Sequence, residues 1–380
     1  MNHHLLTLAM AQMYELRNRL ANVNYPMANL LTLRDELLYF ADSIHSRSVI
    51  GIQKKDLFHN CIDVNQISDF MTKMLGSANV VIPAEMKYVV LKMIDYWVPF
   101  QANNKVYVFT NGNYAVSHLK LDKLGLSRLE SRCKRRFSNM PIFIYVPEQF
   151  SNDMITNVAL FHEVGHIVEH RFSLATDILK DVLKEIIKSP GGKMMNNYFP
   201  NAIKSDGTLN EDIVRAYIEE YVADLFGAQY LGTYMLAYLE YLEFYDRHRL
   251  SEDHPSLFCR LKLVDSFMQC MSTSKHTTHD IFLDNIMNTF SRVIQKDLTL
   301  RNIHITNAKS NLESGSPINI GSLDELFSLF ATSWEVITGG ILKVENARSL
   351  AKGSLSKYDF YNHINTGLKA TISNFMTNNP

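Results

Sequence analysis

The chain of 380 residues has 46% hydrophobic and 11% aromatic side chains, enough to bury a sizeable core in two or three packed units. Its 38 basic and 39 acidic residues leave a formal charge of -1, which excludes a global electrostatic attraction to nucleic acid or to an anionic membrane. No nucleic-acid partner is therefore predicted, and any partner has to be recognised locally.

Cysteine usage and hydropathy favour a soluble, cytoplasmic protein. The cysteines form no CxxC pair, which argues against thiolate zinc sites and redox motifs and suits a reducing compartment. They are Cys61, Cys133, Cys259 and Cys270. The N-terminal stretch meets Glu15 and Arg17 too early for a signal peptide. The most apolar later stretches, 230–245 and 327–342, contain acidic residues, so no transmembrane segment is predicted.

The first hundred residues are predicted to be helical, because apolar side chains such as Leu30, Leu33 and Leu37 recur at helical spacing. Two β-rich stretches follow. Residues 106–109 and 114–116 flank Asn111-Gly112, which accepts the positive φ values of a tight turn and predicts a hairpin. Residues 142–146 lie between two prolines, which favours an edge strand that could bind an extended peptide by strand addition.

Nearly all of the chain after about residue 151 is predicted to be helical. The expected fold class is therefore mainly α with a small β-sheet (α+β). We expect an N-terminal helical region over residues 1–100, a core over residues 101–265 and a C-terminal helical region over residues 266–380. The two helical flanks have no chemical signature and could bind a regulatory protein partner.

The motif HExxH lies on a predicted helix, at residues 162–166. A spacing of four residues places His162 and His166 on one helix face, where both imidazoles can bind one zinc ion. Glu163 then projects beside the metal and can act as the catalytic base on its water. The alternative for this segment is a pair of surface histidines.

A catalytic zinc site needs a third protein ligand. The metzincin pattern would require Gly at position 169 and His at position 172, but the chain has Glu169 and Phe172 there. His170 lies two turns from His162, about 12 Å along the helix axis, so it cannot share that ion without breaking the helix. The third ligand therefore has to come from elsewhere in the chain.

The best candidate is Glu220, in the segment Tyr217–Gly227. Glu220 and Asp224 share a helix face, so Glu220 could bind zinc while Asp224 accepts the N–H of a ligating histidine and fixes its tautomer. Glu219 is a weaker alternative. The competing interpretation is a solvated acidic face, but the segment is otherwise very apolar, and a buried carboxylate there needs a cationic partner.

HEVGH followed by E-x-x-A-D resembles the gluzincin metallopeptidases, particularly the minigluzincins and the HtpX and CAAX-protease branch. The segment 253–260, with His254-Pro255-Ser256 and Arg260, is similar to a further motif of that branch. The resemblance covers about residues 140–265. It implies a zincin-like core with the active-site helix beside an edge strand. Those relatives are commonly membrane proteins, and that property is not transferred here.

The expected function is zinc-dependent hydrolysis of peptide bonds, with one zinc per chain and a peptide or protein substrate. Glu163 would take a proton from the zinc-activated water and return it to the leaving amine. His254, or failing that Arg260, would stabilise the oxyanion. We expect an endopeptidase rather than an exopeptidase.

Two alternatives remain open at this point. The chain could be an inactive, zincin-like scaffold or partner-binding regulatory protein, or it could hydrolyse something other than a peptide.

Two further features are interpreted as structural or are left unassigned. A basic cluster is expected to be a solvated helix face, and it comprises Arg128, Arg132, Lys134, Arg135 and Arg136. The pair His276 and His279 is left unassigned.

Overall fold

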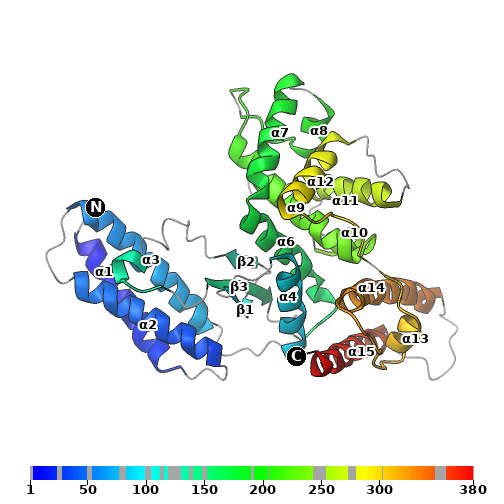
Figure 1. The fold of residues 1–380 in the computed structure, drawn as a ribbon, viewed down its shortest axis with the longest axis horizontal. Helices are drawn as coiled ribbons and strands as arrows, with labels where there is room; N and C mark the ends of the chain where they lie inside the picture. The colour runs from blue at the N-terminus through cyan, green and yellow to red at the C-terminus, as the bar shows by residue number, and fades with distance from the viewer. Residues whose placement is uncertain are drawn as a thin grey trace. The chain divides into compact units, whose positions relative to one another are not determined.

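A computed structural model describes most of the chain and divides it into two compact units (Figure 1). The described residues are 3–23, 28–48, 54–76, 83–98, 104–111, 115–118, 130–136, 140–147, 152–189, 192–204, 206–242, 254–272, 280–301, 303–346 and 357–379. Unit 1 contains residues 1–82 and 100–151, and unit 2 contains residues 83–99 and 152–380. Most described residues are helical, which confirms the mainly α prediction.

Unit 1 begins with three helices that pack against one another: α1 (His3–Ala21), α2 (Ala28–Ser48) and α3 (Lys54–Gly76). Each helix buries an apolar stripe, represented by Met13, Phe40 and Ile67. Because the buried apolar side chains within each helix recur mostly at intervals of three and four residues, one face of each helix enters a shared core.

A three-stranded sheet also belongs to unit 1, with strand order β1-β3-β2. Its strands are β1 (Asn104–Asn111), β2 (Ala115–His118) and β3 (Met140–Pro147). Strand β3 pairs with β1 in parallel and with β2 in antiparallel orientation. The predicted hairpin is therefore wrong, because β3 lies between the two strands that the Asn-Gly turn would have paired.

The prediction that residues 142–146 form an edge strand is also wrong. Pro141 and Pro147 lie near the ends of β3, and β2 pairs only with residues 142–145 between them. The prolines therefore leave the middle of the strand free to form ladders on both sides. Since β1 and β2 occupy both sides of β3, this strand cannot bind a peptide by strand addition. Strand β3 is therefore not the edge strand that was expected beside the active-site helix.

Unit 2 is helical and contains the HExxH segment. Its elements are α4 (Ala84–Trp97), the 3₁₀ turn η3 (Thr156–Val158), α6 (Ala159–Phe172), α7 (Leu174–Lys188), α8 (Lys193–Tyr198), α9 (Glu211–Leu231), α10 (Tyr234–Leu242), α11 (Leu257–Ser272), α12 (Ile281–Ile294), α13 (Ala308–Glu313), α14 (Leu323–Asn346) and α15 (Lys357–Asn378). Helix α9 is central, since α6, α7, α10, α11 and α14 all pack against it (Figure 1). Its C-terminal half, from Glu220 to Leu231, is buried throughout.

The two units do not follow the predicted boundaries near residues 100 and 265. Helix α14 packs against α9, and α4 packs against α6, so one core joins the N-terminal segment 83–99, the HExxH helix and the C-terminal helices. Among the helices of the described residues, none combines the length and apolarity that a bilayer crossing requires.

Candidate metal centre

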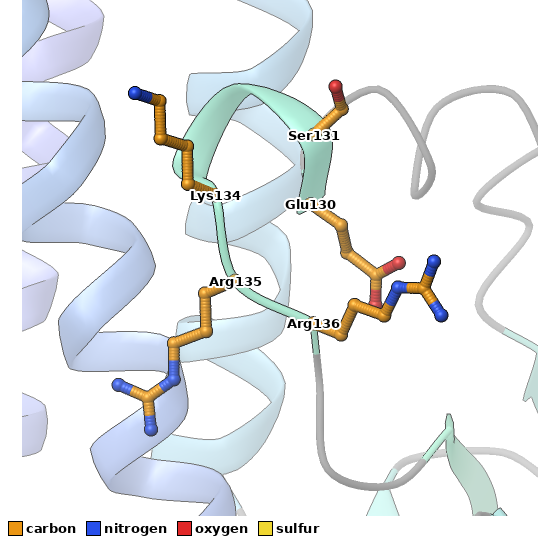
Figure 2. A pocket seen from close by; sticks show the side chains of 5 residues that line it. All are labelled: Glu130, Ser131, Lys134, Arg135 and Arg136. Carbon is orange, nitrogen blue, oxygen red and sulfur yellow. The ribbon is translucent and has the colours of Figure 1, made fainter.

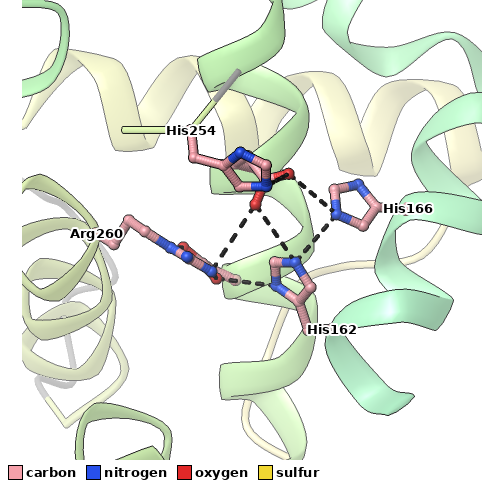
Figure 3. Close-up of polar contacts among 6 residues, drawn as sticks. His162, His166, His254 and Arg260 are labelled. Atoms are coloured by element: carbon pink, nitrogen blue, oxygen red, sulfur yellow. Dashed lines mark hydrogen bonds and ion pairs between the residues drawn. The ribbon is translucent and has the colours of Figure 1, made fainter. Parts of the chain in front are cut away.

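Helix α6 presents both histidines of the HExxH motif on one face. The Nε2 atoms of His162 and His166 lie 3.0 Å apart, and the two rings are nearly perpendicular (Figure 3). One helical turn separates residues four positions apart, which is why the two side chains meet. The helix ends at Phe172, and the next residue, Ser173, has a φ of 55° in the left-handed region.

Helix α9 brings the Glu220 carboxylate to the same point. Glu220 Oε2 lies 3.5 Å from His162 Nε2, and Oε1 lies 3.3 Å from His166 Nε2. Four donors around a zinc ion with bonds of about 2.0–2.1 Å are separated by about 3.3 Å when the geometry is tetrahedral. The three observed separations match that edge length, so His162, His166 and Glu220 form a group that could hold a metal ion.

A close helix crossing makes this meeting possible. Gly165 lies between the two histidines, and a Cβ atom added there would be 2.7 Å from the Ala223 Cα and 2.9 Å from the Phe226 Cβ. Glycine on α6 and alanine on α9 thus let the two backbones approach. Any larger residue at position 165 would clash with the α9 backbone at Ala223, so this contact between the two helices would have to open.

Asp224 holds the other side of the His162 ring. Its Oδ1 atom lies 2.9 Å from His162 Nδ1, and the residue is 0% exposed. This contact leaves Nε2 of His162 directed at the metal-ligand group, as expected for a carboxylate that orients a ligating histidine. Arg260 of α11 pairs with the same carboxylate through Nε, at 2.8 Å, and Nη2, at 2.6 Å.

The charges of this cluster favour a bound cation. Burial by itself would lower the pKa of His162, but the carboxylates of Asp224 and Glu220 outweigh it and raise that pKa to about 10. Burial also opposes the charged form of His166, and Glu220 nevertheless raises its pKa. The histidines in turn hold the pKa of Glu220 well below its ordinary value despite burial. Because the cluster stabilises positive charge, a metal ion can take the place of protons on the histidines.

Glu163 and His254 both lie near the metal-ligand group but differ in their exposure to solvent. Glu163 is buried, and its carboxylate is close enough to raise the pKa of His166 electrostatically. His254 is 59% exposed, and its Nε2 atom lies 3.5 Å from Glu220 Oε1 (Figure 3). His254 therefore borders the centre on a side that solvent reaches, where a substrate group could contact it.

The alternatives for the third ligand lie elsewhere. His170 is exposed near the end of α6, and Glu219 is half-buried and does not belong to the group of possible ligands among the described residues. Glu169 is buried and accepts the backbone N–H of Ala175 at 3.1 Å, so it stabilises the start of α7. These positions agree with the choice of Glu220.

Arg260, the second candidate for the oxyanion donor, is less suited to that role than the exposed His254. Its guanidinium is buried, and its Nε and Nη2 atoms donate to Asp224. Spacing within the motif identified the residue, but its partner lies 36 positions away and is determined by packing of α11 against α9.

The basic cluster divides into two parts in unit 1. Lys134, Arg135 and Arg136 are exposed and line a surface pocket together with Glu130 and Ser131 (Figure 2). Arg132 instead contacts Asp63 and Asn60 of α3. The exposed part fits the expected solvated face, whereas Arg128, His276 and His279 lie outside the described residues.

Comparisons with known proteins give no relative. No protein-family model matches the chain, and neither the curated proteins nor the solved structures give a match to it.

Proposed function

We propose that this protein is a zinc-dependent metallopeptidase of the gluzincin type, with His162, His166 and Glu220 as the metal ligands. The observation that supports the proposal most directly is the donor triangle, whose three separations of 3.0, 3.3 and 3.5 Å suit a single tetrahedral ion. Two imidazoles and one carboxylate form a ligand set that catalytic zinc uses, with a fourth position left for water.

When bound, zinc would act as a Lewis acid that lowers the pKa of a water molecule from about 16 towards 7. The protein's own groups would perform the remaining steps. Asp224 orients His162, and Glu163 takes a proton from the attacking water and gives it to the leaving amine. His254, at the solvent-facing side, would donate a hydrogen bond to the carbonyl oxygen of the substrate as negative charge develops there.

The proposed substrate is a peptide or protein, cleaved internally. Glu163 favours an enzyme over a scaffold, because a purely structural zinc site has no use for a base beside the metal and normally fills all four positions with protein ligands.

The decisive experiment compares Glu163→Gln with His162→Ala. Purified wild-type protein should contain about one zinc per chain and cleave members of a peptide library. Glu163→Gln should keep its zinc and its fold but lose roughly 100- to 10,000-fold in turnover, because only the basicity of the side chain is removed. His162→Ala should lose both zinc and activity.

Two outcomes would contradict the proposal. Wild-type protein that binds no zinc would exclude the metal centre. A Glu163→Gln variant with wild-type turnover, alongside an inactive His162→Ala variant, would show that the metal acts structurally, and a partner-binding role would then replace the peptidase.

A further inference from the structure

Arg260 belongs to the first turn of α11, yet its side chain reaches the group of possible metal ligands on α6 and α9 (Figure 3). Only 5% of the residue is exposed. Two of its nitrogens donate to the two oxygens of Asp224, Nε to Oδ2 and Nη2 to Oδ1. A guanidinium fork of this kind fixes the rotation of a carboxylate as well as compensating its charge.

Asp224 depends on this partner because it has no access to solvent. An ionised carboxylate is costly to bury without a cation and hydrogen bonds. The same Oδ1 atom that accepts from Arg260 lies 2.9 Å from His162 Nδ1. Arg260, Asp224 and His162 therefore form a continuous chain of contacts from α11, through α9, to α6.

Arg260 also faces the third ligand. Its Nη2 atom lies 3.8 Å from Glu220 Oε2, too far for a hydrogen bond but close enough for electrostatic attraction. Arginine remains charged at every working pH and has no acceptor atom, so it cannot itself bind the metal. Arg260 therefore compensates the charge of the Asp224 and Glu220 carboxylates without competing with them for the ion.

The position of Arg260 is set by the start of α11. Ser256 lies directly before the helix, and its Oγ accepts the backbone N–H of Cys259 at 3.4 Å, as an N-cap residue does. The helix packs against α9 and α10. The guanidinium can reach Asp224 only while α11 is docked in this way.

We propose that Arg260 is a positioning residue of the metal centre, which acts through Asp224 on His162 and makes metal affinity dependent on the docking of α11. The inference rests on the proposed function only in requiring that Zn²⁺ binds at His162, His166 and Glu220. It makes no assumption about the substrate.

The test measures the affinity of the full chain for Zn²⁺ alone, by competition with a chromophoric chelator. Arg260→Gln and Asp224→Asn should each weaken binding by roughly 10- to 100-fold, the usual effect of removing a group that orients a ligand. Because both act on one chain of contacts, the double variant should be no more than slightly weaker than the poorer single variant. Arg260→Lys, which keeps the charge but loses the fork, should fall in between.

Lys262→Gln provides the matched control. It makes the same change of charge in the same helix, two positions along, at a half-buried residue, and should leave Zn²⁺ affinity at the wild-type value. A folded Arg260→Gln variant with wild-type affinity would overturn the inference. So would a double variant whose loss equals the product of the two single losses.

A second measurement applies if Arg260→Gln does not fold. Hydrogen exchange of the wild-type chain should show that Zn²⁺ increases the protection of α11 amides, and unchanged protection would overturn the coupling. A wild-type chain that binds no Zn²⁺ would overturn the proposed function and this inference together, and that result is known before any variant is compared.

Discussion

Gly165 of α6 lies directly against Ala223 of α9, and a Cβ atom added at position 165 would be 2.7 Å from the Ala223 Cα. A backbone atom cannot move aside as the end of a flexible side chain can. The contact therefore determines how closely the helix with two of the possible ligands approaches the helix with the third.

The substitution Gly165→Ala should consequently destabilise the fold by about 1–3 kcal/mol, as overpacking of a tight interface does, and should weaken zinc binding. Chemical denaturation and zinc titration measure the two effects. Gly339→Ala in α14 is the control, because a Cβ atom there meets nothing within 4 Å. That variant should be neutral or more stable by up to about 1 kcal/mol, since alanine favours helix. Equal effects at both positions would refute the steric argument.

Glu220→Ala should remove most of the bound zinc, because it deletes one of three donors. Its neighbour Glu219→Ala makes the same chemical change at a half-buried position outside the ligand group and should retain about one zinc per chain. Metal analysis of the two purified variants distinguishes them. Full zinc content in Glu220→Ala, with loss in a Glu169 or His170 variant, would mean that the ligand assignment is wrong.

His254→Ala should reduce kcat by roughly 100-fold while zinc affinity stays close to that of the wild type. The side chain is 59% exposed and lies 3.5 Å from Glu220, so its removal deletes a donor for the substrate without opening the ligand group. Steady-state kinetics on a library-derived peptide, together with zinc titration, measure both. An unchanged kcat would mean that His254 is an exposed surface residue with no role in catalysis.

Glu169→Gln should make stability less dependent on pH. Burial raises the pKa of Glu169 from its ordinary value of 4.5 to about 7, so the folded protein binds this proton more tightly than the unfolded chain does. The resulting stabilisation is complete below about pH 4.5 and is lost as the pH rises through about 7. Above that range the wild type has to bury a charged carboxylate, whereas glutamine carries no charge and can still accept the Ala175 N–H.

The variant should therefore gain stability relative to the wild type between about pH 5 and pH 8, by on the order of 2 kcal/mol. Urea denaturation at the two pH values measures this difference. Glu313→Gln, at an exposed position of α13, should show no comparable gain. A constant difference between Glu169→Gln and the wild type across this range would contradict the linkage.

Local periodicity was sufficient to predict the parts of the candidate centre that lie on one helix. Four-residue spacing places His162 beside His166, and Glu220 beside Asp224, because a helix returns to the same face after one turn. The mainly α content follows from the same periodicity. These features depend on neighbours in sequence, and the amino-acid sequence by itself therefore determined them.

Tertiary packing decided what each residue contacts across the chain. The sequence pointed to Arg260 but not to its bond with Asp224, which exists only because α11 docks on α9. Residues 142–146 have the sequence character of a strand whether that strand is at the edge or in the middle of a sheet. Only the pairing with β1 and β2 makes β3 central. In both cases the partner lies far away in sequence, and the free energy of packing the whole core, rather than any local pattern, selects it.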